Sequence, residues 1–303
     1  MRMEEEGLSA AEAVHATLRD NVFGLELDER CAQIAAFNLA LTAWKIGGYQ
    51  ALPPLHLACS GLAPHATEKD WVALADDSDS ANPKLEGRLQ RGMARLYSLF
   101  KDAPVLGSLI NPRAAEDELL EAAFHELQPL LEKALAQEAD TRADLSAVGL
   151  AKAEMAVTAR GLAKAAEILA GQFTLVATNV PYLGRGKQDD VLKDYCERVH
   201  PDAKADLATC FIERCLGFCD SSGSAALVTP HNWLFLPTYR KLREDLLHKC
   251  QWKLVARLGA RAFETISGEV VNVALMAITA TLPKKESMMG GLDVAKAKSA
   301  LEK

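Results

Sequence analysis

The sequence from Phe173 to Tyr182 reads FTLVATNVPY, an apolar stretch that ends in four residues of a different character. The Phe, Val and Thr residues of 173–178 favour a buried β-strand. Asn179-Val180-Pro181-Tyr182 follows directly, and residues that follow a strand of a parallel sheet lie at the edge where such sheets bind ligands. This tetrapeptide is therefore the first candidate for a functional site.

The tetrapeptide contains the groups needed to hold an exocyclic amine beside an aromatic ring. The amide oxygen of Asn179 and the backbone carbonyl of Val180 are two hydrogen-bond acceptors that could fix one amine and direct its lone pair outward. The side chain of Tyr182 could stack on the ring that carries the amine. An ordinary turn after a strand also uses Asn and Pro, and the four residues alone leave both interpretations open.

Upstream of this stretch, short apolar runs alternate with helical patterns. Ser9 and Glu12 have the spacing of a capping box, and Asp28 stands where the N-cap of a second helix belongs. The pattern predicts a helix at 9–19, a strand at 22–27, a helix from Asp28 to about Gly47-Gly48 and a strand at 55–59. Such alternation is typical of an α/β fold in which helices cover a parallel sheet.

Downstream, a polar loop is predicted at 76–84, and residues 85–169, rich in Ala, Leu, Glu and Lys, predict an inserted helical region. The alternation then returns, with a helix at 205–219, a turn at 221–223, a strand at 224–229, a helix at 238–248 and strands at 253–258 and 270–279. We expect 20–60 and 173–280 to share one mostly parallel sheet. The predicted divisions are 1–75, a helical insertion at 76–171, 172–282 with the tetrapeptide, and a tail without its own core at 283–303.

The composition excludes few classes of protein. The formal charge is −7, from 34 basic and 41 acidic residues, which neither indicates nor excludes a nucleic-acid binder. The seven cysteines form no C-x-x-C pair, so no metal site is expected, and Cys215 and Cys219 are expected to be buried apolar residues. No run approaches the roughly 18 apolar residues of a membrane span and no signal peptide is evident, so we expect a cytoplasmic protein without membrane contact.

Glu26 ends the strand predicted at 22–27. An acid at this place binds the ribose hydroxyls of a nucleoside cofactor in many Rossmann-like folds. An acid that ends a strand can instead cap the next helix, but Asp28 is better placed for capping. Glu26 is therefore a candidate ribose ligand.

Five stretches, taken in order and spacing, resemble the adenine-specific DNA methyltransferases of restriction–modification systems. The similarity is greatest to the phage-defence type known as BREX or phage growth limitation, and it covers most of residues 1–280. The stretches are GLELD (24–28), ATNVPYL (177–183), AKADL (203–207), VTPHNWL (228–234) and AFETISGEVVNVAL (262–275).

The resemblance implies a Rossmann-like, S-adenosylmethionine-dependent methyltransferase fold with an inserted helical region. It implies transfer of a methyl group from S-adenosylmethionine to the exocyclic amine of a flipped adenine. Asn179, Val180, Pro181 and Tyr182 would grip the adenine, and Glu26 would bind the cofactor. The implied partners are double-stranded DNA and other subunits of a phage-defence system.

The sequence departs from the family at two site positions. The family tetrapeptide is Asn-Pro-Pro-Tyr or Asp-Pro-Pro-Tyr, so Val180 replaces a proline but keeps the backbone carbonyl. Ser60 stands near the place of a further cofactor-binding acid, which implies contact through a hydroxyl or the backbone. Phe263 matches an aromatic residue that packs near the target base.

Three basic residues are further candidates for substrate contact. Lys204, with Asp206, could orient the substrate loop or only pair across a helix start. Arg185 and Lys187 could contact DNA phosphates or only lie in a solvated loop.

The glycine-rich loop that the family places before the helix at 9–19 has no counterpart in the sequence. We therefore expect a chain truncated at both ends, lacking the first strand and glycine loop, that binds S-adenosylmethionine poorly. One alternative is an inactive remnant or a split-enzyme subunit that only binds DNA or a partner protein. Another is a dinucleotide oxidoreductase, which would use Glu26 but would not explain Asn179–Tyr182. In the methyltransferase, Glu26 and Asn179 should meet at one edge of the sheet.

Overall fold

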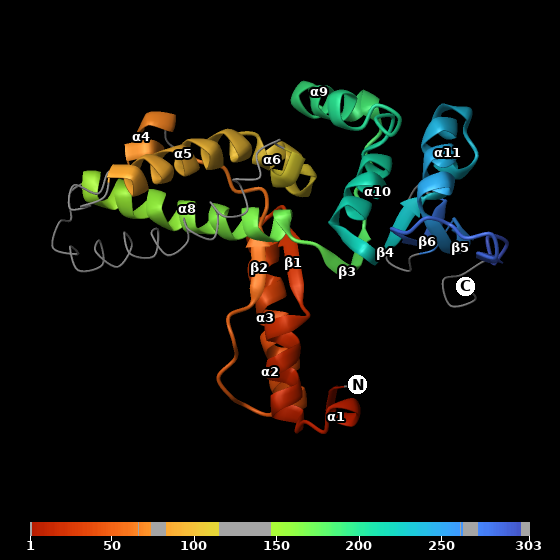
Figure 1. The fold of residues 1–303 in the computed structure, drawn as a ribbon, viewed down its shortest axis with the longest axis horizontal. Coiled ribbons are helices and arrows are strands. Elements are labelled where there is room, and N and C mark those ends of the chain that lie inside the picture. The colour runs from red at the N-terminus through yellow and green to blue at the C-terminus, as the bar shows by residue number, and fades with distance from the viewer. Residues whose placement is uncertain are drawn as a thin grey trace. The chain divides into compact units, whose positions relative to one another are not determined.

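The computed structural model describes residues 2–65, 67–73, 83–114, 147–260, 262 and 272–297. The chain divides into two compact units, Met1–Ala170 and Gly171–Lys303, which run from red to green and from green to blue in Figure 1. Within the described ranges, no helix is both long enough and apolar enough to cross a lipid bilayer.

The first unit contains a two-stranded parallel sheet. In this sheet β1 (Phe23–Glu26) pairs with β2 (His56–Cys59) so that Glu26 lies opposite Cys59. Helices α3 and α8 pack on the strands, α2 packs on α3, and α5 packs on α4 and α8. The helices of this unit are α1 (Arg2–Glu5), α2 (Ala10–Asp20), α3 (Glu29–Gly47), α4 (Glu68–Ala73), α5 (Pro83–Phe100), α6 (Ala103–Leu106) and α8 (Ala147–Ala170), with the short 3-10 helices η1 (Gly107–Leu109) and η2 (Pro112–Ala114).

Local capping sets the bounds of the first long helices. Ser9 N donates to Glu12 Oε2 at 2.9 Å while Glu12 N donates to Ser9 Oγ at 3.3 Å, which completes the predicted capping box at the start of α2. Asp28 caps α3 by accepting from the Arg30 backbone N at 2.8 Å. Gly48 follows α3 with a φ of 78°, which favours glycine. The predicted bounds of both helices are confirmed to within one or two residues.

The carboxyl ends of β1 and β2 approach each other closely. Ser60 N donates to Glu26 O at 2.7 Å, which extends the pairing by one residue past β2. A Cβ at Gly61 would lie 2.2 Å from the backbone oxygen of Leu27 and 2.9 Å from its Cδ1. Only glycine therefore fits at position 61 without a shift of the backbone.

We predict that Gly61→Ala lowers the free energy of unfolding by about 1–3 kcal/mol, because the added methyl group must push two backbones apart. Gly87→Ala is the matched control, since the new Cβ inside α5 would meet only the flexible end of Arg91 at 3.6 Å. Alanine is the better helix former by about 1 kcal/mol, so this control should unfold at an equal or higher urea concentration. Equal urea midpoints for Gly61→Ala and the unsubstituted chain would contradict the prediction.

The second unit contains a five-stranded sheet with the order β3-β4-β6-β5-β7, and the labels of its first four strands follow this order in Figure 1. β6 runs antiparallel to both of its neighbours, whereas β3 is parallel to β4 and β7 is parallel to β5. Four strands therefore point the same way and share one carboxyl edge. The strands are β3 (Phe173–Asn179), β4 (Cys219–Pro230), β5 (Gln251–Gly259), β6 (Val273–Thr279) and β7 (Gly290–Asp293).

Helix α10 packs on β3 and β4 and supplies much of the core of this unit. Cys215 and Cys219 are buried there, as predicted. The other large buried side chains include Ile212, Leu227, Trp233, Leu242 and Ile278. The helices are α9 (Asp190–Val199), α10 (Leu207–Phe218) and α11 (Arg240–Lys249), with the 3-10 helices η3 (Arg185–Lys187), η4 (His231–Leu234) and η5 (Pro237–Tyr239).

The predicted α/β class is confirmed, and every described element between 83 and 170 is helical, as predicted; residues 115–146 lie outside the described ranges. The prediction of one shared sheet is wrong for the described strands, which form two sheets. Joining these sheets would require a strand paired with both, and the described residues include none. The direction of β6 also makes the larger sheet mixed.

Three smaller differences concern single elements. The turn predicted at 221–223 is part of β4, which already begins at Cys219 and is irregularly paired near Phe173. The tail at 283–303 contributes β7, and neither β7 nor α9 was predicted. The division into 1–75, 76–171, 172–282 and 283–303 stays a prediction.

Candidate functional site

The tetrapeptide lies at the carboxyl end of β3. Asn179 is the last residue of the strand and is exposed. Val180 is only 3% exposed, and its backbone N donates to the Val228 carbonyl of β4 at 3.3 Å. This buried anchor gives a physical reason why valine can replace proline here, because burial and strand pairing fix the backbone that a proline ring would otherwise restrict.

Tyr182 lies beside Asn179. Its hydroxyl donates to the Asn179 amide oxygen at 3.4 Å. Burial of the half-buried phenol, and then the charge of Asp206, raise the Tyr182 pKa above its usual value. The phenol is therefore neutral near pH 7, and a neutral aromatic ring suits stacking on a heterocycle.

The loop that follows the tetrapeptide is attached to the segment before α10. Leu207 N donates to Leu183 O at 2.9 Å and Arg185 N donates to Ala205 O at 3.0 Å. The Gln188 side chain is buried and donates to the same Leu183 carbonyl at 3.0 Å. These bonds hold the backbone directly after Tyr182 in one conformation.

Asp206 connects this loop to α10. Its Oδ1 accepts from Ala208 N at 2.9 Å, which caps α10, and from Leu183 N at 3.3 Å. One carboxylate therefore fixes both a helix start and the first residue after the tetrapeptide. The geometry supports a structural role for Asp206 in orienting the loop.

We predict that Asp206→Ala lowers the free energy of unfolding by about 1 kcal/mol, because an N-cap is lost. Asp206→Asn is the matched control, since asparagine keeps an acceptor oxygen and caps helices about as well. Thermal unfolding of the three proteins should place the asparagine variant near the unsubstituted chain and the alanine variant below it. Coincident transitions for all three would show that the cap contributes nothing.

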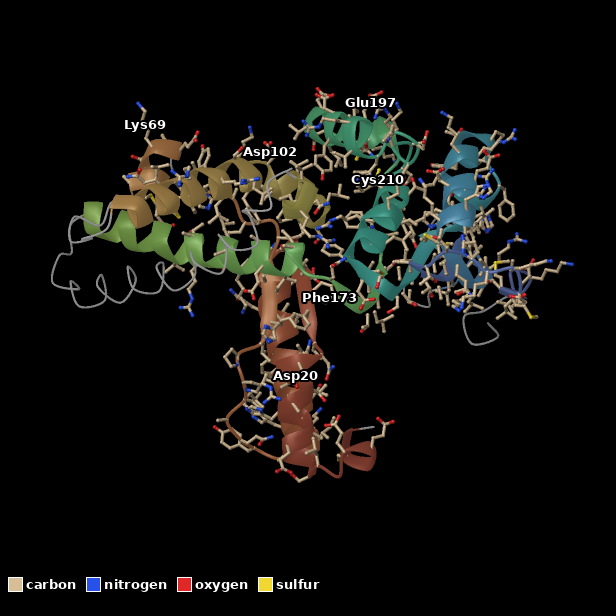
Figure 2. The ribbon with its side chains drawn as sticks, in the orientation of Figure 1. Asp20, Lys69, Asp102, Phe173, Glu197 and Cys210 are labelled. Atoms are coloured by element: carbon tan, nitrogen blue, oxygen red, sulfur yellow. The ribbon has the colours of Figure 1, made fainter. Side chains whose placement is uncertain are left out.

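Two of the predicted substrate-binding cations are paired with one acid. Glu197, labelled on α9 in Figure 2, binds Arg185 through one carboxylate oxygen and Lys204, at 2.6 Å, through the other. The hydrogen bond from Lys204 and then the charge of Arg185 lower the Glu197 pKa below its usual value. Arg185 and Lys204 thus brace the loop in this structure, and Lys187 is exposed on η3. Contact of these three cations with DNA stays a prediction.

Sequence reasoning missed Glu197 and Gln188, which hold this loop. Arg185 and Glu197 are twelve positions apart and belong to different elements, η3 and α9, so only the fold brings the two together. A buried glutamine has no sequence signal of its own.

The first unit holds the predicted cofactor residues at the carboxyl edge of β1 and β2. Glu26 is exposed, and the neighbouring Leu27 is 52% exposed. Ser60 is fully buried, and its hydroxyl donates to Glu26 O at 3.1 Å and lies 3.2 Å from Ser108 Oγ. In this structure the Ser60 hydroxyl therefore holds the strand ends together and does not face an open surface.

Glu26 therefore presents a solvent-facing carboxylate, the kind of group that binds ribose hydroxyls in many Rossmann-like folds, and its contact with a cofactor stays a prediction. A groove of about 890 Å³ in the same unit includes Cys59 and Lys164 but neither Glu26 nor Ser60. Glu26 and Asn179 lie in different units, so their predicted proximity stays a prediction. Phe263 lies outside the described residues.

The family model described as Eco57I restriction-modification methylase matches residues 20–263 of the chain. Among curated proteins, the chain is 28% identical over 295 residues to the adenine-specific methyltransferase PglX of Lacticaseibacillus casei (strain Zhang). It is 29% identical over 298 residues to the adenine-specific methyltransferase BrxX of Escherichia coli O9:H4 (strain HS). These matches cover 95% and 91% of the chain but only 22% and 23% of the two relatives.

Among solved structures, the chain is similar to a nuclease-deletion mutant of the Type ISP restriction-modification enzyme LlaGI in complex with a DNA substrate mimic. The TM-score is 0.47 with 9% sequence identity, over 99% of this chain and 23% of that one.

Proposed function

Because this chain belongs to the Eco57I restriction-modification methylase family, we propose that it forms part of an adenine-specific DNA methyltransferase of a phage-defence system. The observation that carries the proposal is the Asn179–Tyr182 tetrapeptide at the carboxyl end of β3, with Val180 anchored to β4 and the Tyr182 hydroxyl at the Asn179 amide. The adenine-specific methyltransferases PglX and BrxX, to which the chain is similar, support the choice of base.

In this proposal the tetrapeptide binds the exocyclic amine of an adenine turned out of the double helix. Asn179 Oδ1 and the Val180 carbonyl accept hydrogen bonds from the amine, and the Tyr182 ring stacks on the base. In the structure Asn179 Oδ1 accepts from the Tyr182 hydroxyl at 3.4 Å. This long bond is readily exchanged for a bond from the amine, which would also leave the phenol free to turn its ring toward the base.

S-adenosylmethionine is the proposed methyl donor, and its sulfonium supplies an electrophilic methyl group when bound. Glu26 would accept from the ribose hydroxyls, and Leu27 would contact the adenine of the cofactor. Ser60 would keep the Glu26 backbone in place through its two hydrogen bonds to the Glu26 carbonyl. The chain's own contribution to catalysis is then positioning and hydrogen-bond acceptance, without a protein nucleophile.

The test is a methylation assay with labelled S-adenosylmethionine and double-stranded DNA. It uses both the 303-residue chain and the full product of its open reading frame, because the chain spans less than a quarter of the two relatives. We expect label in N6-methyladenine from the full product after digestion of the DNA to nucleosides, and little or none from the 303-residue chain, which is expected to bind S-adenosylmethionine poorly. No label is expected when the DNA adenines are already methylated. Label in cytosine, or DNA binding without any methyl transfer by the full product, would contradict the proposal.

A further inference from the structure

The segment between β4 and α11 presents two neighbouring apolar side chains to solvent. Phe235 is 57% exposed and Leu236 is 45% exposed. We call these two residues the Phe235 tip. β4 leaves the sheet at the same edge as β3, since the two strands are parallel and Asn179 pairs with Val228. The tip therefore follows the carboxyl edge that carries the tetrapeptide, within the same unit.

The backbone under the tip is held by hydrogen bonds that do not involve the exposed side chains. Arg243 Nη1 donates to Trp233 O at 2.6 Å and to Leu236 O at 2.8 Å. The N–H groups of Phe235 and Leu236 both donate to Asn232 O at 3.0 Å. Such a clamped backbone is preorganised, so the tip would lose little conformational entropy on binding.

The buried side of the segment is equally fixed. Trp233 is 1% exposed, its indole Nε1 donates to Thr229 Oγ1 at 3.2 Å, and its ring lies 5.9 Å from that of Trp252. The core thus accepts Trp233 and leaves Phe235 outside, although both residues could supply apolar area. Phe235 and Leu236 together therefore form a small exposed apolar pair on a rigid support.

The surroundings of the tip favour a polyanion. The segment 231–243, which contains the tip, carries Arg240, Lys241 and Arg243 and no acid, in a chain with a net charge of −7. The Arg257 guanidinium carbon lies 5.1 Å from the Phe235 ring centroid, and the His231 ring meets the Phe235 ring edge-on at 5.6 Å. Arg257 also pairs with Asp293 at 2.7 Å, which holds it beside the ring.

We propose that the Phe235 tip is a DNA-stacking element, in which the Phe235 ring stacks on a base exposed beside the flipped adenine. The inference rests on the proposed function, because it adds a second DNA contact to the same carboxyl edge. Base–aromatic stacking tolerates any sequence and is strengthened by neighbouring arginine. Apolar side chains inserted beside an opened base step also stabilise distorted DNA.

The test compares DNA binding by Phe235→Ala, Phe235→Tyr and Leu247→Ala in the full product of the open reading frame. Leu247 is the matched control, since it is 53% exposed on α11 and the proposal gives it no role. Affinity is measured by fluorescence anisotropy at fixed salt, and stacking by the fluorescence of 2-aminopurine placed next to the target adenine. Circular dichroism establishes that each variant is folded.

We expect Phe235→Ala to weaken DNA binding by roughly 5- to 150-fold, the size of one base–aromatic stack, and to abolish the change in 2-aminopurine fluorescence. Phe235→Tyr should retain both properties, and Leu247→Ala should match the unsubstituted protein. Equal affinity and equal fluorescence for Phe235→Ala overturn the inference, as does a change in oligomeric state alone, which would indicate a protein partner.

These readouts do not depend on methyl transfer. If the unsubstituted protein methylates adenine while Phe235→Ala binds DNA normally, the inference fails and the proposed function stands. If the protein transfers no methyl group but Phe235→Ala loses DNA affinity, the proposed function fails and the stacking role stands. Absence of DNA binding by the unsubstituted protein overturns both.

Discussion

Replacement of Asn179 by alanine is expected to lower the rate of DNA adenine methylation by about a hundred- to a thousandfold, the cost of removing one preorganised polar group from an active site. In the proposed function the amide oxygen is the side-chain acceptor for the amine, and the Val180 carbonyl alone would not fix the direction of the lone pair. The fold should be unaffected, because Asn179 is exposed at the end of β3 and its side-chain bond with Tyr182 is long.

Single-turnover methylation and thermal unfolding separate these two effects. Asn179→Asp is the matched control, since the tetrapeptide of the family that the sequence resembles begins with either Asn or Asp. This variant should retain more activity than the alanine variant. The unfolding temperatures of all three proteins should agree closely. A methylation rate for Asn179→Ala within a few-fold of that of the unsubstituted protein would contradict the assignment of Asn179 as the acceptor for the amine.

Glu26→Gln should weaken binding of S-adenosylmethionine by about 10- to 100-fold, since a hydrogen bond to a charged acceptor contributes about 1.5–3 kcal/mol. Glutamine keeps the shape of the side chain and removes the charge. The backbone oxygen of Glu26 holds Ser60 in either case, so the substitution should leave the stability of the first unit unchanged. Isothermal titration calorimetry of the full product measures the affinity directly.

Glu29→Gln is the control for this measurement, because Glu29 is also exposed and lies in the first turn of α3. It should bind the cofactor as the unsubstituted protein does. Titration with NAD tests the alternative of a dinucleotide oxidoreductase. Tight NAD binding that depends on Glu26, without binding of S-adenosylmethionine, would contradict the methyltransferase proposal and support the dinucleotide oxidoreductase.

The parts of the fold that the sequence predicted depend on local signals. The capping box of Ser9 and Glu12 and the N-cap at Asp28 set helix starts through groups only a few residues apart. The strand β7 could not be found in this way, because four exposed residues with two glycines acquire strand geometry only by pairing with β5. The separation into two sheets likewise depends on which strands meet, and composition does not determine this.

In the candidate site, too, the residues found from the sequence depend on local signals, and the contacts around them do not. Asn179–Tyr182 could be proposed from the sequence, because the family resemblance and the preceding strand are both recognised from consecutive residues. The contacts around this segment come from distant parts of the chain, as in the pairing of Glu197 with Arg185 and the approach of Arg257 to Phe235. The predicted proximity of Glu26 and Asn179 is also a contact between distant parts of the chain, and it stays a prediction.

The antiparallel direction of β6 allows the connection between β5 and β6 to vary in length. Gly259 at the end of β5 pairs with Val273 at the start of β6, so the chain leaves and re-enters the sheet at the carboxyl edge. When the ends of a connection are already paired, each doubling of its length costs only about 0.6 kcal/mol. Insertions between Gly259 and Val273 can therefore lengthen this connection at low cost without changing the register of any strand.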